Sequence, residues 1–313
     1  MLKYLVILLD DTSVSYCHYT NTRQERRLIS PEHLAAGIHF AMMENLTVQF
    51  VYPGYALPQT HLDLIQTIDH TKIVPADYDG KAAVCVLDGW EGLSAVPCDK
   101  EAVYVLRTSK ADLFSHYARL VDLFPKLKRL NVVLTDVETF TEADFAVYRD
   151  VLGQLAVRLG EVYREGSSFQ LNLLTDRMLL DTMNNCNAGW ENITLAPDGC
   201  FYVCPAFYLE GKDCAVGDLD HGFDIRNPQL YRLDHAPLCR KCDAYQCRRC
   251  VWLNRRTTLE VNTPSHEQCV VAHLERNASR ALLEDIRKYG EFRPECEIKE
   301  IDYLDPFDKK EVY

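Results

Sequence analysis

The chain has 313 residues, 47% of them hydrophobic, with a formal net charge of −12 and a pI of about 5.3. An acidic balance of this size argues against a protein that binds nucleic acid by neutralising its phosphates. The early apolar run Leu5–Leu9 is shorter than a signal-peptide core, and no stretch approaches the roughly 20 apolar residues of a membrane span. We therefore expect a cytoplasmic globular protein with no nucleic-acid or membrane partner.

Short apolar runs and helix-period segments alternate over the first 185 residues. The runs that predict strands are Tyr4–Leu9, Val48–Tyr52, Ala83–Leu87, Ala102–Leu106, Leu130–Thr135 and Phe169–Leu174. The segments that predict helices begin after the Ser30-Pro31 start signal and continue with Ala111–Phe124 and Glu142–Tyr163. In the first helix we expect Leu34, Ile38 and Met42 on the buried face. Strands that alternate with helices predict an α/β fold with a mostly parallel sheet, either open or closed into a partial (β/α) barrel.

The chain changes character near residue 186, where the periodic pattern gives way to Gly, Pro, Asp and Cys. A later helix is predicted from about Ser265 to Tyr289, and the segment after it is charged and acidic. We expect three parts: an α/β domain over 1–185, a small cysteine-rich domain over 186–290 and a charged C-terminal tail over 291–313, solvated along its length.

Cysteine provides the strongest signal for function. The chain has 13 cysteines, and ten of them fall between Cys186 and Cys296. In a reducing compartment such a count favours metal ligation over disulfides. The run Cys239-x2-Cys242-x4-Cys247-x2-Cys250 places two close pairs within twelve residues, a spacing that suits tetrahedral zinc or an iron–sulfur cluster. Further candidate ligands are Cys186, Cys204 and Cys269, and seven thiolates are more than one zinc ion can use.

Positive charge gathers around this run in an otherwise acidic chain. The cations are Arg240, Lys241, Arg248, Arg249, Arg255 and Arg256, with Asp243 as the acid among them. Thiolate-bound clusters carry net negative charge, which nearby cations would offset. The alternatives are that these side chains form a solvated face or a phosphate-binding patch, and that the cysteines form a zinc ribbon.

The ordered cysteines resemble the SPASM domain of radical SAM peptide maturases. The resemblance rests on Cys186, Gly199-x4-Cys204, the four-cysteine run and Cys269, although the run is one residue shorter in each of two gaps than the usual C-x2-C-x5-C-x3-C. It implies two 4Fe–4S clusters. One cluster takes Cys239, Cys242, Cys247 and Cys269, and the other takes Cys186, Cys204 and Cys250. The second set is one ligand short, so either Cys200 or Cys214 completes it or one iron stays open.

The N-terminal part lacks the residues that bind SAM in the radical SAM enzymes it resembles. Those enzymes place C-x3-C-x2-C after their first strand, whereas this chain has Asp10, Val14 and Cys17 at those positions. The Gly-Gly-Glu-Pro turn after the second strand is replaced by Tyr52-Pro53-Gly54-Tyr55. We expect no SAM binding, no SAM cleavage by this chain alone, and Cys17 to be an ordinary half-buried thiol.

The opening segment Leu2–Tyr19 is similar to that of the CXXX repeat peptide maturases, so the resemblance spans most of the chain. It implies an accessory iron–sulfur protein in the maturation of a ribosomally made, cysteine-rich peptide. The implied partners are the precursor peptide and a radical SAM maturase, with electron relay as an added role. Two alternatives stay open: a peptide-modifying enzyme that acts through an open iron, and a zinc-stabilised interaction module. Whether the chain is itself an enzyme, and its catalytic residues, stay undetermined.

Overall fold

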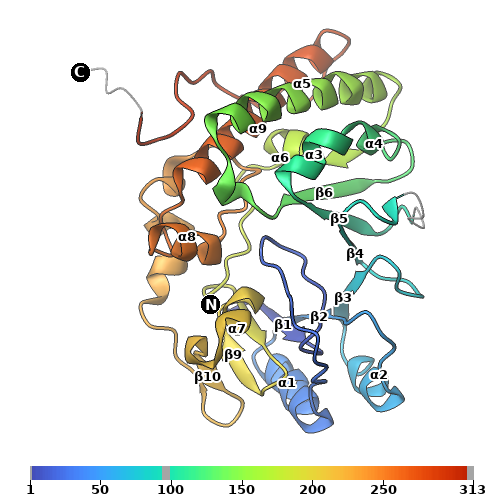
Figure 1. Ribbon diagram of the computed structural model, residues 1–313, viewed down its shortest axis with the longest axis vertical. Coiled ribbons are helices and arrows are strands. Elements are labelled where there is room, and N and C mark those ends of the chain that lie inside the picture. Colours follow the sequence, from blue (N-terminus) through green and yellow to red (C-terminus); the bar gives the residue numbers. More distant parts are fainter. Residues whose placement is uncertain (1, 94–98, 309–313) are drawn as a thin grey trace.

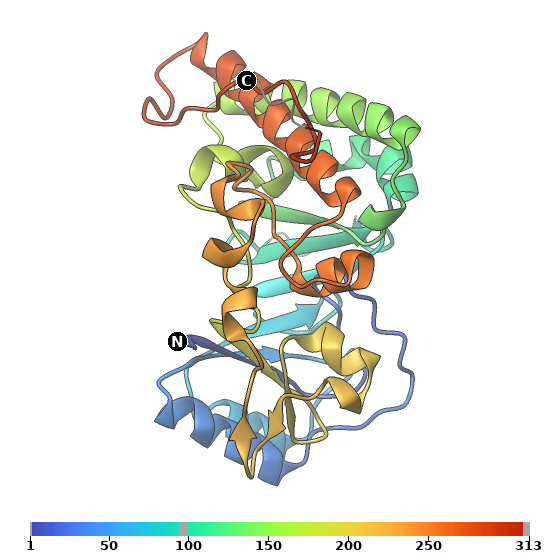
Figure 2. The same cartoon turned by 90° about the vertical axis from the view of Figure 1, so that its left-hand side faces the viewer.

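The structure is a computed structural model that describes residues 2–93 and 99–308. A single mixed sheet of eleven strands forms its frame, in the order β11-β10-β9-β8-β1-β2-β3-β4-β5-β6-β7. The strands are β1 (Tyr4–Leu8), β2 (Thr47–Val51), β3 (His70–Pro75), β4 (Val84–Asp88), β5 (Val103–Thr108), β6 (Arg129–Leu134), β7 (Gln170–Leu171), β8 (Asn192–Leu195), β9 (Cys200–Tyr202), β10 (Gly217–Asp218) and β11 (Gly222–Phe223). The strands from β8 to β7 are parallel, and β9 to β11 extend the β8 edge as antiparallel strands. This confirms the predicted α/β class, and the curved sheet resembles a partial barrel (Figures 1 and 2).

Helices cover the sheet in separate groups. They are α1 (Pro31–Met43), α2 (Gln59–Ile65), α3 (Lys110–His116), α4 (Ala118–Val121), α5 (Glu142–Arg164), α6 (Asn172–Leu179), α7 (Pro205–Glu210), α8 (Val251–Thr258) and α9 (His266–Arg287). Helices α1 and α2 lie beside the strands from β1 to β3, whereas α3 to α6 lie at the β5–β7 end, where α9 packs on α5 and α6 (Figure 1). None of the helices in the described residues is long and apolar enough to cross a bilayer.

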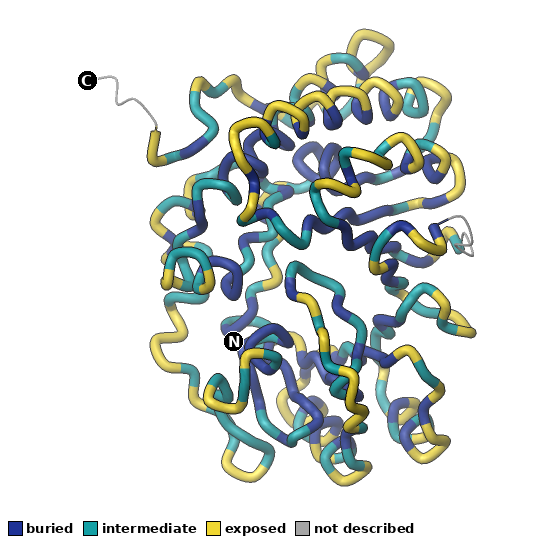
Figure 3. Tube along the Cα trace, viewed as in Figure 1, coloured by how far each residue is buried: buried dark blue, intermediate teal, exposed yellow. Residues whose placement is uncertain are grey.

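The core follows the predicted helix faces closely. The sequence period places Phe145, Tyr148, Leu152, Leu155 and Leu159 on one face of α5, and all five are buried. The corresponding residues of α9, Val270, Leu274, Leu282 and Ile286, are buried as well, and Figure 3 shows dark stretches along both helices. In α1 Leu34 and Ile38 are buried, but the prediction for Met42 is wrong, because its side chain is 61% exposed near the end of the helix.

The predicted strand Phe169–Leu174 is also wrong in its second half. Strand β7 ends at Leu171, and α6 begins at Asn172. The Asn172 side chain accepts a hydrogen bond from Val132 N at 2.7 Å and donates one to Val132 O at 2.9 Å. The amide therefore replaces the next backbone pair of the ladder, which frees the chain to turn into a helix.

Part of the tail packs against the protein, contrary to the expected solvated extension. Ile298 and Asp305 are buried, and Arg276 of α9 donates to Lys299 O at 2.7 Å. His266, at the start of α9, lies 2.5 Å from an Asp305 carboxylate oxygen. Residues 309–313 of the predicted tail lie outside the described residues, as does Cys98, one of the three cysteines before residue 186.

The loop after β1, residues 9–30, crosses the carboxyl ends of the parallel strands. Its His18 ring contacts Leu134 O, at the end of β6, at 2.8 Å. Arg107 of β5 is buried and donates to Cys17 O at 2.9 Å and to Tyr19 O at 2.6 Å. Because ligand sites of open parallel sheets gather at this edge, the loop lies where a functional site is expected.

Candidate metal centres

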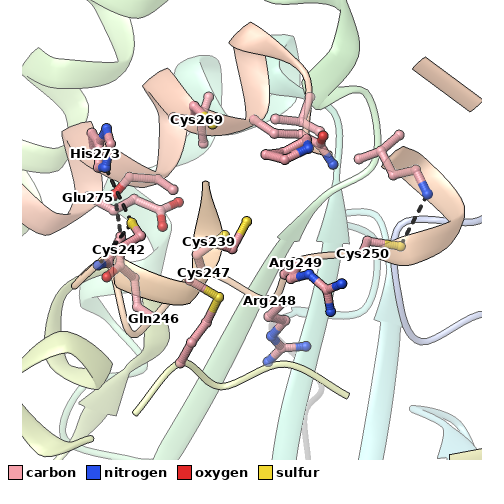
Figure 4. Close-up of a pocket in the computed structure, with 18 of the residues that line it drawn as sticks. Cys239, Cys242, Gln246, Cys247, Arg248, Arg249, Cys250, Cys269, His273 and Glu275 are labelled. Atoms are coloured by element: carbon pink, nitrogen blue, oxygen red, sulfur yellow. Dashed lines mark hydrogen bonds between the residues drawn. The ribbon is translucent and has the colours of Figure 1, made fainter. Parts of the chain in front are cut away.

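Four of the predicted ligands gather beside the start of α9, and we call them the α9 group: Cys239, Cys242, Cys247 and Cys269. The first three lie on the loop before α8, and Cys269 lies in the first turn of α9. All four line one cavity, and Figure 4 shows their side chains around a common space. The four cysteines that the resemblance assigned to one cluster therefore line the same cavity, and Cys250 lines it too.

The loop that carries this group is fastened to α9 by hydrogen bonds. Asp243 accepts two bonds from Arg276, at 2.6 and 2.7 Å. Gln246 donates to Ala272 O at 2.6 Å, and the Cys242 sulfur lies 3.5 Å from His273 Nε2. Asp243 and Gln246, which lie between the cysteines in the sequence, therefore hold the thiol-bearing loop against α9.

Burial and crowding act on these thiols together. Burial raises the pKa of Cys239 to about 11, with an opposing effect from Arg249. Burial also raises the pKa of Cys247 and of Cys269, and the negative charges of neighbouring cysteines add to it. Several thiolates so close together need a cation to ionise jointly, which is what a metal centre provides.

A second set of thiols surrounds the loop after β1, and we call it the β1-loop group: Cys17, Cys186, Cys204 and Cys250. Burial raises the pKa of Cys250 to about 12, and the charges of Cys186 and Cys17 raise it further. Burial likewise raises the pKa of Cys204, with added effects from Cys250 and Cys186. The three predicted ligands are thus brought together, and Cys17 joins them, which the sequence did not indicate.

Two members of this group stand at helix starts. Cys204 is the residue before α7, and Cys250 is the residue before α8, where its sulfur accepts from Leu253 N at 3.5 Å. Backbone amides at a helix N-terminus favour a thiolate and lower its pKa, in opposition to burial. Cys186 lies in an irregular segment, and the residue as a whole is exposed. Its thiol group is nevertheless surrounded by protein, and this burial raises its pKa.

The two cysteines predicted as fourth ligands face other groups. Cys200 lies in β9, where its thiol donates to Asp198 O at 4.0 Å. The Cys214 sulfur lies 3.8 Å from Glu210 and 3.6 Å from Arg255. Neither contact directs the thiol toward the β1-loop group.

Of the six cations predicted to surround the cysteine run, Arg248 and Arg249 lie beside the two cysteine groups in the described part of the chain. Arg248 lines the cavity between the two groups, and its charge opposes the rise in the pKa of Cys17 and of Cys186 (Figure 4). Arg249 is buried, donates to Tyr231 O at 3.0 Å and is hydrogen-bonded to the Cys239 thiol. The remaining cations of the run point elsewhere. Arg255 and Arg256 pair with acids on other elements, and Arg240 and Lys241 are exposed.

The spacing of the sulfurs bears on which metal they fit. Tetrahedral zinc with Zn–S bonds of about 2.3 Å holds its sulfurs about 3.8 Å apart. Within the described part of the chain, the one set of three or more ligand atoms that all lie within 4.8 Å of one another is His266, Asp305 and Asp308. Neither cysteine group is that compact. A cubane cluster separates its thiolates more widely than a zinc ion does, because the iron–sulfide cube lies between them.

Hydrogen bonds of Asp10 and Val14 hold the loop after β1. Asp10 accepts bonds from Thr12 N at 2.8 Å and from the Tyr55 hydroxyl at 2.8 Å. Val14 N donates to Tyr52 O at 2.9 Å. The residues at two of the three cluster positions therefore tie the loop to the segment after β2.

Solved structures share the fold of this chain at low sequence identity. No protein-family model matches the sequence, and no curated protein matches it. Solved structures of anSMEcpe, a radical SAM sulfatase-maturating enzyme with a SPASM domain, do match. The form with bound AdoMet and the Cp18Cys peptide has a TM-score of 0.65 at 12% identity, over 92% of this chain and 100% of that chain. The form with bound AdoMet alone gives 0.61 at 14% identity, over 91% and 99%.

Sequence reasoning missed Arg107, the buried cation that holds the loop. A single charged residue near the end of the apolar run Val103–Thr108 could have indicated it. In the structure Arg107 forms a salt bridge with Asp88 at 2.6 Å. Sequence reasoning also assigned no ligand role to Cys17, although its position after the first strand could have suggested one.

Proposed function

We propose that this protein holds two 4Fe–4S clusters and acts as an accessory protein in the maturation of a ribosomally made, cysteine-rich peptide of the CXXX repeat type. The observation that carries the proposal is the presence of two separate thiol groups in one radical SAM and SPASM fold. When bound, such clusters supply one-electron transfer.

The chain's own residues would hold and tune these clusters. Thiolates of the α9 group and the β1-loop group bind them, and Arg248 between the groups offsets their negative charge. The amide of Leu253 at the start of α8 would donate a hydrogen bond to the Cys250 sulfur, which would raise a cluster's reduction potential. Two centres on either side of one cation suit electron relay.

The proposed partners are a precursor peptide and a radical SAM maturase. Support for a peptide comes from the fold, since the matching anSMEcpe structures include complexes with the Cp18Cys and Kp18Cys peptides. Support for a separate SAM-cleaving partner comes from the loop after β1, where Asp10 and Val14 replace two thiolates and are engaged in other contacts. The accessory role, and the division into domains at residues 186 and 291, are part of this proposal.

The decisive experiment is anaerobic purification followed by iron and zinc analysis, absorption and EPR spectroscopy. We expect about eight iron atoms per chain and broad absorption near about 400 nm. Stoichiometric zinc without iron would refute the cluster proposal and favour the zinc-stabilised module. Reduced protein with SAM should yield no 5′-deoxyadenosine above a no-protein control. A partner-free preparation that modifies the peptide would favour an enzyme over an accessory protein.

A further inference from the structure

The loop after β1 contacts α7, the helix that begins directly after Cys204. Arg23 of the loop donates to Tyr208 O of α7 at 3.1 Å, and the Tyr208 hydroxyl also contacts Asp11 and Arg27. The contacts bring the loop beside the helix that begins after Cys204.

The same loop reaches the cavity that the α9 group lines, next to the start of α8. His18 lines that cavity together with Cys250 and Arg248. Helices α7 and α8 are themselves joined, because Trp252 donates to Glu210 at 2.7 Å. The segments that carry Cys17, Cys204 and Cys250 therefore converge at one place.

Buried groups hold Cys17 at this point of convergence. Arg107 donates to its carbonyl oxygen at 2.9 Å and pairs with Asp88, while the next residue, His18, is held by Leu134 O. Tyr16, which precedes Cys17, and Tyr19, two residues after it, also contact each other: their rings meet edge to face with 5.9 Å between centroids. The backbone of the Cys17 segment is therefore held in place by Arg107 of β5 and by the end of β6.

We propose that Cys17 supplies the fourth thiolate of the cluster held by Cys186, Cys204 and Cys250. This inference rests on the proposed function, because it assumes that this group binds a cluster at all. On binding, the Cys17 thiol would release its proton to solvent, and its sulfur would replace a solvent-derived ligand on iron with no change in oxidation state. The ligand comes from the loop after the first strand, more than 160 residues before the other three in the sequence.

Ligation by Cys17 has a consequence for chemistry. With four protein thiolates each iron of this cluster is closed, so water, substrate or a peptide thiol has no vacant position. The cluster then serves electron transfer and fixes the β1 loop against α7 and α8. The alternative of an enzyme that acts through an open iron loses its site.

The test compares Cys17→Ala with three single alanine variants: Cys85, a cysteine of strand β4, and Cys200 and Cys214, the other candidate ligands. All are purified anaerobically, and iron content and EPR spectra are recorded. We expect Cys17→Ala to lose about one to four of eight iron atoms and to change the EPR signal of one cluster, while the signal of the other cluster persists as evidence of folding. The three control variants should match the unaltered protein.

Chemical rescue separates ligation from packing. Added 2-mercaptoethanol should bind the iron that Cys17→Ala leaves open and restore the original EPR signal, an effect that a merely structural cysteine would not give. If the unaltered protein contains no iron, the proposed function fails. If it contains two clusters and Cys17→Ala leaves both iron content and EPR unchanged, the proposed function stands and this inference is overturned. A change in Cys200→Ala or Cys214→Ala instead would also overturn it.

Discussion

Asp243 joins the loop of the α9 group to two buried arginines, and its removal tests how that loop is held. Arg276 and Arg177 are 1% and 4% exposed, and Asp243 accepts from them at 2.6, 2.7 and 3.0 Å. Burial raises the pKa of Asp243, but the hydrogen bonds from the two arginines outweigh it and leave the pKa below its usual value. The carboxylate is therefore charged at neutral pH and is the counter-ion of this pair.

Asp243→Ala leaves both cations without that acid. Breaking a buried ion pair from one side costs about 3–5 kcal/mol. Because the Asp243 side chain is 34% exposed, solvent recovers part of this, and we expect a loss of about 2–4 kcal/mol. For a chain of 313 residues the entropy of unfolding is about 0.7 kcal/mol/K, so the Tm should fall by about 3–6 °C.

The assay is thermal unfolding followed by circular dichroism on anaerobic protein, with Asp150→Ala, an exposed acid of α5, as the control. Iron content should fall as well, since Asp243 lies between two ligands of the α9 group. The double variant Asp243→Ala/Arg276→Met should lose less than the sum of the two single changes, because one unpaired cation has been removed. A Tm within 1 °C of the unaltered protein for Asp243→Ala would refute the reasoning.

Three further outcomes are expected. Cys242→Ala should abolish one cluster and leave the EPR signal of the other intact, and unchanged iron would contradict this. Gly199 has φ +78°, and a Cβ there would lie 2.7 Å from the His33 ring. Gly199→Ala should therefore lower the free energy of unfolding by about 1–3 kcal/mol, and adding His33→Ala should recover part of this loss. Equal Tm values for the unaltered protein and both variants would contradict the clash. The hydrogen bond with Asp305 raises the pKa of His266 despite partial burial, so this pair stabilises the docked tail below about pH 6.5 and loses that effect as pH rises through the raised pKa. Hydrogen-exchange protection of residues 298–308 should be higher at pH 6 than at pH 9, and His266→Gln should remove the difference.

The sequence determined those features that depend on neighbours along the chain. The buried faces of α5 and α9 follow from helical periodicity, and most strands from short apolar runs. Cysteine spacing indicated that Cys239, Cys242 and Cys247 share one loop, and the resemblance to the SPASM pattern added Cys269 to complete the α9 group. Local pattern failed where a side chain replaced a backbone partner, as Asn172 does at the end of β7.

Tertiary structure decided what lies together from distant parts of the chain. Cys17 lies near enough to Cys186 and Cys250 for their charges to act on one another, because the loop after β1 crosses the sheet and is fixed by Arg107 of β5. No periodicity or motif spacing records a contact between segments more than 160 residues apart, since that contact depends on strand order and on which helices cover the sheet. The sequence therefore indicated the chemistry of the thiols, and the packing of the fold selected which of them meet.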